Sequence, residues 1–308
     1  MPAKRSHVQR RLAAKGLLHI VAAAVALGCF FPMGGYAQSN RPDSWGNDTA
    51  RQASEPPKRA ARQTGVSRIT PARTQAVAEC KEDNPDTVGW LHVPGTDIDR
   101  VVLQNPPKLE NNDYYLSRDF DGSYLRDGSF CTDYRVQFGD GSRGALSRNI
   151  TVYGHSWDDD PNGRLFAQLK QFRDPDFATS TPYIFFSTEA EDMAWEVFAV
   201  LDATVDLPYI TPDPSNRRWL DTLDIVYDLS YYSYDTVVQP QDTVLTLSTC
   251  TFSVLGHEAL PEWNDYRFVI MARLVPPDEA IKEQAVFTLN TSRTAPDDIR
   301  ERIEQYHL

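Results

Sequence analysis

The run Asp242–Cys250 most constrains the fold, because it alternates β-forming side chains and ends on a cysteine. Its sequence, Asp-Thr-Val-Leu-Thr-Leu-Ser-Thr-Cys, predicts a strand in which successive side chains point to opposite faces. Leu245 and Leu247 share one face. Ser248 and Cys250 lie on the other, more polar face. The pattern therefore predicts a strand that delivers a thiol to the edge of a sheet.

Two other runs follow the same alternation. In Asn149–His155, the histidine falls on the polar side of a predicted strand. In Asp265–Leu274, the apolar side chains take one face and leave Arg267 on the mixed face. A thiol, an imidazole and a guanidinium can therefore converge at one end of a sheet.

This set of side chains suits nucleophilic catalysis. A cysteine nucleophile needs a proton acceptor, and imidazole titrates near neutral pH. A fixed guanidinium can donate hydrogen bonds to the oxyanion that forms when a thiolate attacks an amide. Taken singly, Cys250, His155 and Arg267 could equally be a structural thiol, a hydrogen-bonded loop residue and a surface ion-pair partner. Their joint pattern favours catalysis.

Composition excludes several classes of protein. With 308 residues and 41% hydrophobic content, the chain can bury one sizeable core with appendages. Residues 1–78 carry 12 basic and 3 acidic side chains, whereas residues 79–308 carry 19 basic and 40 acidic ones. The excess of acidic residues in 79–308 argues against nucleic acid as a partner. It would tolerate a cationic amine substrate. An acidic excess is also typical of a well-solvated surface.

The sequence gives no indication of a cofactor or metal. It has neither the GxGxxG nor the GxxxxGK[ST] pattern, and its four cysteines lack CxxC spacing. Cys80 and Cys131 fall in a predicted helix and a predicted strand, where small buried thiols are common, and a disulfide between them remains an alternative.

The N-terminal region has the order of an export signal. Basic residues precede an apolar stretch at 16–31, so residues 1–37 are predicted to be either a retained membrane anchor or a cleaved secretory signal. The retained anchor is favoured, with the N-terminus in the cytoplasm. Residues 38–69 are polar and basic, and they predict a flexible linker.

The rest of the chain predicts a mostly β domain over 70–275 and an acidic tail over 276–308. Helices are expected at 70–81, 165–172, within 215–230, and at 296–306. Strands are expected at 88–93, 98–104, 114–116, 129–136, 149–153, 183–187 and 194–202, in addition to the two runs around Cys250 and Arg267. Short, closely spaced strands of this kind indicate a closed barrel.

The sequence resembles the sortases, and class B sortases in particular, over about residues 85–275. The His, Cys and Arg runs described above occur in the order that this family uses. Other segments similar to class B positions are Asn84–Ile98, Asp113–Leu116, Gly128–Phe130, Asp133–Arg135 and Arg164–Phe166.

That resemblance implies a sortase-type closed β-barrel with an N-terminal helix and a helix-containing connection before the cysteine strand. It implies a cysteine transpeptidase without a cofactor. Such an enzyme cleaves a C-terminal sorting motif of a secreted protein at a Thr–Gly or Thr–Asn bond through a thioester. An amine of a peptidoglycan precursor, or a pilin lysine, then resolves the thioester on the outer face of a Gram-positive cytoplasmic membrane.

By resemblance, Cys250 is the nucleophile, His155 the general acid and base, and Arg267 the oxyanion or substrate-backbone donor. Ser248 and Thr249 would line the sorting-signal groove.

The segment Thr251–Tyr266 is longer than class B enzymes usually have, and it brings a second histidine, His257, as a rival base. His155 is favoured, since a strand end holds an imidazole more precisely than an inserted loop.

Three alternatives remain. Papain-like amidases place cysteine before histidine, and L,D-transpeptidases use a Ser-x-Gly-Cys motif, whereas here histidine comes first and Ser248-Thr249 precede the cysteine. The third alternative is a catalytically silent, sortase-like surface binding module.

Overall fold

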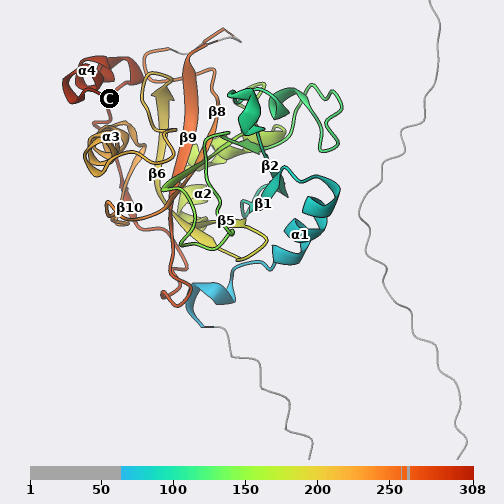
Figure 1. Ribbon diagram of the computed structural model, residues 1–308. Helices are drawn as coiled ribbons and strands as arrows, with labels where there is room; N and C mark the ends of the chain where they lie inside the picture. Colours follow the sequence, from blue (N-terminus) through green and yellow to red (C-terminus); the bar gives the residue numbers. More distant parts are fainter. Residues whose placement is uncertain (1–63, 258, 262–263) are drawn as a thin grey trace, which may run out of the picture. The chain divides into compact units, whose positions relative to one another are not determined.

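Eight strands close into a barrel in the part of the chain that the structure describes (Figure 1). The structure, a computed structural model, describes residues 64–257, 259–261 and 264–308. The barrel strands are β1 (Thr87–His92), β2 (Asp99–Gln104), β3 (Cys131–Thr132), β4 (Asn149–Tyr153), β5 (Tyr183–Ser187), β6 (Ala194–Thr204), β8 (Val244–Cys250) and β9 (Tyr266–Leu274). Their order around the barrel is β1-β2-β3-β4-β8-β9-β6-β5. The mostly β, closed barrel that the sequence predicts is confirmed.

The cysteine strand lies between the other two predicted site strands. β8 pairs in parallel with β4 and antiparallel with β9. A parallel neighbour needs a long crossover, which here includes β5, β6 and the helix α3 (Asn216–Leu229). The expected helix in the connection before β8 is therefore present.

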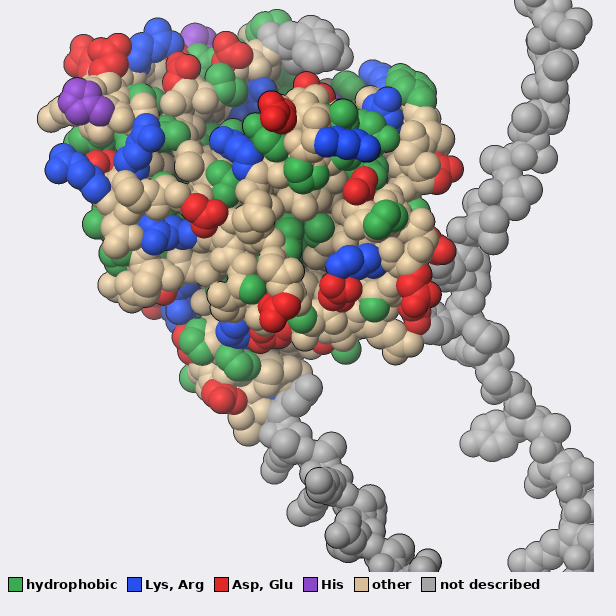
Figure 2. Space-filling model, in the orientation of Figure 1, with side chains coloured by type: hydrophobic (Ala, Val, Ile, Leu, Met, Phe, Trp, Pro, Cys, Tyr) green, Lys and Arg blue, Asp and Glu red, His purple; other side chains and the backbone are tan. Residues whose placement is uncertain are grey.

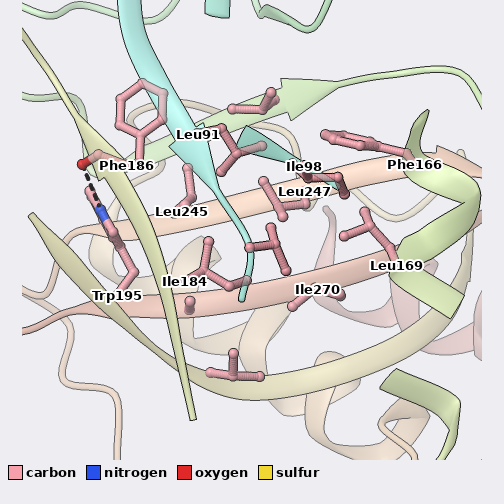
Figure 3. Packing of buried hydrophobic residues seen from close by; sticks show 14 of the residues in the cluster. Leu91, Ile98, Phe166, Leu169, Ile184, Phe186, Trp195, Leu245, Leu247 and Ile270 are labelled. Atoms are coloured by element: carbon pink, nitrogen blue, oxygen red, sulfur yellow. Dashed lines mark hydrogen bonds between the residues drawn. The ribbon is translucent and has the colours of Figure 1, made fainter. Parts of the chain in front are cut away.

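Apolar side chains from most of the barrel strands fill its interior (Figure 3). Leu245 and Leu247 point inward from β8, and Phe268 and Ile270 point inward from β9, as the alternation predicts. The indole Nε1 of Trp195 donates to the Phe186 carbonyl at 3.2 Å, which satisfies the one polar group of that side chain.

A second core lies outside the barrel, beneath α3. The buried side chains Trp219, Leu223 and Val226 recur at helical spacing along α3 and pack in a cluster with Val269 and Met271 of β9. The opposite face of β9 is thus buried as well, so the mixed pattern around Arg267 reflects a covered face rather than a solvated one. Ser215 caps α3 by accepting a hydrogen bond from the backbone N–H of Arg218 at 3.4 Å.

The C-terminal residues pack onto the domain instead of extending from it. β10 (Phe287–Leu289) pairs with β7 (Tyr232–Tyr234), and the 3-10 turn η5 (Pro296–Ile299) leads into α4 (Arg300–Tyr306). Ile299 is buried in the cluster beneath α3. Arg302 of α4 forms ion pairs with Asp224 and Asp228 of α3. The acidic tail predicted for 276–308 therefore completes the second core.

The folded body begins before residue 70. The 3-10 turn η1 (Gly65–Arg68) buries Val66 in a cluster with Tyr183 and Val275. α1 (Thr74–Asp83) starts four residues later than the helix expected at 70–81. The Asp192 carboxylate accepts from the backbone N–H groups of Arg73 and Thr74, so a residue distant in sequence sets the start of the helix.

Two predicted strands are shorter or absent. Residues 114–116 fall largely in the 3-10 turn η3 (Tyr115–Ser117), where the buried Tyr115 donates its hydroxyl to Asp86 and its backbone N–H to Asn105. Only Cys131–Thr132 of 129–136 are paired as β3, because Asp133 bonds the following backbone into a turn. Tertiary hydrogen bonds override strand propensity in both places.

Two short helical segments link β4 to β5. The predicted helix at 165–172 is a 3-10 helix, η4 (Leu165–Arg173), and α2 (Pro175–Ser180) follows it. Cys131 is a buried free thiol, so the disulfide with Cys80 is not formed in the structure.

The predicted anchor at 1–37 and most of the predicted linker lie outside the described residues. Among the residues described, no helix is long and apolar enough to cross a membrane. On the face shown in Figure 2, acidic and basic side chains are interspersed without a continuous basic area.

The interior of the barrel should dominate its stability. Leu245→Ala removes a fully buried side chain, so we expect the free energy of unfolding to fall by about 2–5 kcal/mol. Leu220→Ala on α3 is the matched control, since Leu220 is 46% exposed. Urea unfolding of the two variants measures the difference, and an equal loss of free energy in both would contradict the assigned core.

Candidate active site

Cys250 is the last residue of β8 and lies opposite Arg267 of β9. The pairing of β8 with β9 places the two as directly opposed residues, so both side chains leave the sheet on the same face. Cys250 is half-buried, and its backbone carbonyl accepts a hydrogen bond from Lys170 Nζ at 2.7 Å. The predicted convergence of the thiol and the guanidinium therefore follows from strand register.

His155 follows β4 after one glycine. A Cβ at Gly154 would come within 2.9 Å of ring atoms of Phe130 and Phe166, so glycine permits the close passage of the chain there. The imidazole stacks on Trp157, with ring centroids 4.6 Å apart. Its Nε2 lies 2.8 Å from the Leu116 carbonyl oxygen. Since a carbonyl only accepts, Nε2 carries the proton and Nδ1 is the nitrogen left for proton exchange.

Arg267 is held by the end of the loop that precedes it. Its Nη1 donates to the backbone carbonyls of Asn264 at 2.9 Å and of Tyr266 at 2.8 Å. Asn264 Nδ2 in turn donates to the Thr251 carbonyl at 3.1 Å, which joins the two ends of the loop. The guanidinium is thus fixed while its other N–H groups make no hydrogen bond with the described residues.

These three side chains line one pocket of about 250 Å³. The pocket wall also includes Leu116, Trp157, Phe252 and Asn264. Within the described residues, no hydrogen bond joins the Cys250 thiol to the His155 imidazole. A bound substrate can complete such contacts, because catalytic hydrogen bonds are often long before the substrate arrives.

Ser248 and Thr249 also line the pocket, but their hydroxyls are engaged within the protein. Each residue is 3% exposed. Ser248 Oγ is 3.0 Å from the Tyr209 hydroxyl, and Thr249 Oγ1 donates to the Gly154 carbonyl at 2.7 Å. Both bonds stiffen the pocket wall. Direct contact between these hydroxyls and a substrate stays a prediction.

His257 lies in the long loop but not in the pocket wall. Its Nε2 is 2.7 Å from Asp297 of the C-terminal tail. The hydroxyl of Tyr266 donates to the other oxygen of the same carboxylate at 2.6 Å, and the pKa of Asp297 is lowered by these two contacts. This contact joins the loop to the tail and places the imidazole of His257 outside the pocket that His155 lines.

The sequence did not predict Lys170, a buried cation that contacts the backbone of Cys250. The side chain of Lys170 is 1% exposed, and burial lowers its pKa to about 8 against the opposing effect of Asp159, 3.6 Å away. In a 3-10 helix three residues make a turn, so Ala167, Lys170 and Arg173 share one face of η4. Lysine side chains are rarely buried, so no pattern in the sequence signals the burial of Lys170.

Arg173 extends the buried polar cluster toward β6. It pairs with Asp159 at 3.4 Å and with Asp202 at 3.1 Å, and it donates to Thr251 Oγ1 at 2.7 Å. Burial raises the pKa of Asp202 despite Arg173 and the hydroxyl of Tyr231. Through Arg173, the charged cluster therefore holds the segment just after Cys250 in place.

No group of three or more His, Cys, Asp or Glu side chains within 64–257, 259–261 and 264–308 is placed to hold a metal ion. The arrangement that remains is a thiol, an imidazole and a guanidinium around a pocket, which can carry out acyl transfer through a covalent intermediate.

Comparison with known proteins finds relatives of this chain in sequence and in structure. No protein-family model matches the chain. Sortase B of Listeria monocytogenes is 33% identical over 193 residues, which cover 62% of this chain and 71% of that protein. The Staphylococcus aureus sortase B–substrate complex superposes with a TM-score of 0.54 at 26% identity, over 66% of this chain and 85% of that one.

A second solved structure, of sortase B complexed with triglycine, superposes with a TM-score of 0.55 at 26% identity, over 68% of this chain and 89% of that one. The sequence match, the closed barrel and these structures confirm the resemblance in fold and in enzyme class. The chain belongs to the sortase B family, whose members are cysteine transpeptidases.

Proposed function

We propose that this sortase cleaves a C-terminal sorting motif of a secreted protein and transfers the acyl part to an amine. The observation that carries the proposal is the register of β8 and β9, which opposes Cys250 and Arg267 beside a pocket that His155 also lines. The name of the S. aureus structure records a substrate bound to that enzyme, which supports a peptide substrate here.

In the first half-reaction, His155 Nδ1 accepts the proton of the Cys250 thiol. The thiolate attacks the carbonyl carbon of the scissile amide and forms a C–S bond. As the tetrahedral intermediate collapses, the C–N bond breaks and the imidazolium returns its proton to the leaving amine. The product is a thioester on Cys250.

Arg267 stabilises the oxyanion of that intermediate. Its hydrogen bonds within the described part of the chain use Nη1 alone, so Nη2 and Nε can donate to developing negative charge. The charge is fixed and preorganised by the loop carbonyls. Lysine could not supply two donors in one plane.

In the second half-reaction, an amine attacks the thioester. Its proton passes to His155, the C–N bond forms and the Cys250 thiolate leaves. The solved structure of sortase B complexed with triglycine supports a peptide amine as the acceptor. We propose an amine of a peptidoglycan precursor or a pilin lysine.

The proposed location is the extracellular face of the cytoplasmic membrane of a Gram-positive cell, with a single N-terminal anchor. The basic residues before the apolar stretch at 16–31 support it. A cleaved secretory signal is the alternative for residues 1–37. A retained span would hold the enzyme where secreted proteins emerge.

Family membership sets aside the papain-like amidase and the L,D-transpeptidase. A silent binding module would have no need for a thiol, an imidazole and a guanidinium around one pocket, and we therefore favour the enzyme.

The thiol and the guanidinium should both be essential. With peptides containing a Thr–Gly or Thr–Asn bond and triglycine as acceptor, we expect Cys250→Ala to reduce cleavage to the uncatalysed background. Arg267→Lys should lower kcat by about 10²–10³-fold, because the planar pair of donors is lost. Chromatography of the cleaved and ligated peptides measures both.

Two matched substitutions serve as controls for that experiment. Cys80→Ala on α1 removes another thiol, and Arg217→Lys changes an arginine on α3 whose side chain is 87% exposed. Both should keep native rates. Full cleavage by Cys250→Ala would contradict the proposed mechanism.

The two histidines should behave differently. His155→Ala should lower kcat by about 10²–10⁴-fold, since it removes the proton carrier. His257→Ala should retain a near-native kcat, because its imidazole contacts Asp297 and the Tyr266 ring and does not line the pocket. The same peptide assay measures both variants, and the reverse pattern would show that the assignment of the base is wrong.

A further inference from the structure

Lys170 contacts the immediate neighbourhood of all three site residues. Its Nζ donates to the carbonyl of Cys250 at 2.7 Å and to Ser156 Oγ, next to His155, also at 2.7 Å. It also lies 5.8 Å from the ring centroid of Phe268, which follows Arg267 in β9. One ammonium therefore joins the histidine loop to the cysteine strand.

The burial of this charge is costly unless its donors are satisfied. An ammonium has three N–H donors, and two of them bond Ser156 and Cys250. Asp159 lies 3.6 Å from Nζ and provides the compensating charge. The remaining groups that influence Lys170 are Arg173, which disfavours its charged form, and Cys250, which favours it. A buried ammonium that is paired and bonded in this way can fix the backbone groups that it contacts.

Asp159 does not depend on Lys170 alone. Its carboxylate also accepts from the backbone N–H of Phe252 at 3.0 Å and from Thr251 Oγ1 at 3.2 Å, and it pairs with Arg173. Asp159 therefore ties the segment after Cys250 to the loop after His155. Loss of the ammonium would leave this carboxylate with partners, so the surroundings can stay folded.

We propose that Lys170 is a positioning residue for the transfer reaction, whose buried ammonium fixes the backbone at Cys250 and at Ser156 and thereby holds the thiol and the imidazole in reactive geometry. The proposal rests on the proposed function of Cys250 and His155. Lys170 acts through these residues and does not touch the substrate.

The contacts of Lys170 depend on its protonation. An ammonium donates to the Cys250 carbonyl and to Ser156 Oγ more strongly than a neutral amine does. With its pKa lowered to about 8, the ammonium is largely protonated at neutral pH and loses its proton as the pH rises through that value. Acylation should therefore weaken above that pH.

Lys170→Met tests the proposal, because methionine keeps a similar length and volume without the charge. In the full chain, we expect the maximal rate of single-turnover peptide cleavage to fall by about tenfold or more, with little change in the peptide concentration that gives half of that rate. The fall in acylation rate near pH 8 should disappear in the variant. Lys81→Met on α1, where the side chain is 40% exposed, is the matched control and should match the native enzyme.

A second measurement needs no sorting peptide. The rate of Cys250 alkylation by iodoacetamide at neutral pH, followed by mass spectrometry of the peptide that contains Cys250, should fall several-fold in Lys170→Met and stay unchanged in Lys81→Met. If the native enzyme cleaved no peptide, the proposed function would fail, and alkylation would still decide the effect of Lys170. A native kcat and alkylation rate in Lys170→Met would overturn the proposal.

Ser156→Ala tests the contact of Lys170 with Ser156 separately from its contact with Cys250. It also keeps the proposal testable if Lys170→Met does not fold. It removes the acceptor on the histidine side while the ammonium keeps its bond to Cys250. We expect a lower kcat with unchanged alkylation of Cys250. A native kcat in Ser156→Ala would overturn the role of Lys170 on the histidine side. Thermal unfolding of each variant checks that the loss is not one of stability.

Discussion

The pairing of β8 with β4 and β9 determines where every proposed reactive group lies. A shift of one residue between β8 and β9 would turn Cys250 into the barrel, where Leu245 and Leu247 now pack, and would separate it from Arg267. The buried leucines therefore determine the position of the proposed nucleophile and also stabilise the barrel. Because β8 is buried on both faces, the cost of such a shift is large and the register is strongly specified.

Strand register does not set the orientation of the His155 and Arg267 side chains. Contacts outside the barrel do. Trp157 and the Leu116 carbonyl orient His155, and the carbonyls at the end of the long loop orient Arg267. That loop is itself joined to the C-terminal tail through Asp297, which contacts His257 and Tyr266. The tail thus supports the loop that holds Arg267, and its packing against α3 makes that support part of the fold.

How well the sequence predicts each element depends on whether the interactions that form it are local or join residues far apart along the chain. Alternation along a strand is local, so the faces of Leu245, Cys250 and Arg267 could be predicted from it. The start of α1 could not be predicted in this way, because it depends on Asp192, which is distant along the chain. Residues 114–116 have strand propensity, yet the hydrogen bonds of Tyr115 to Asp86 and Asn105 impose a turn.

Lys170 marks the limit of sequence reasoning at the site. A lysine in a helical segment is normally solvated, whereas Lys170 lies in a segment of which most residues are buried. Its acceptors come from separate segments, so no spacing in the chain reveals them. The position of His257 likewise follows from a contact with the tail, which the loop sequence alone does not encode.

Trapping of the acyl-enzyme tests the central claim most directly. The full chain, mixed with a cleavable sorting peptide without an acceptor amine, should gain the mass of the acyl fragment on Cys250. Hydroxylamine should release this adduct, as it does a thioester. Fragmentation mass spectrometry locates the modified residue. Cleavage of the peptide with no adduct, or with the adduct on a residue other than Cys250, would contradict acyl transfer at this site.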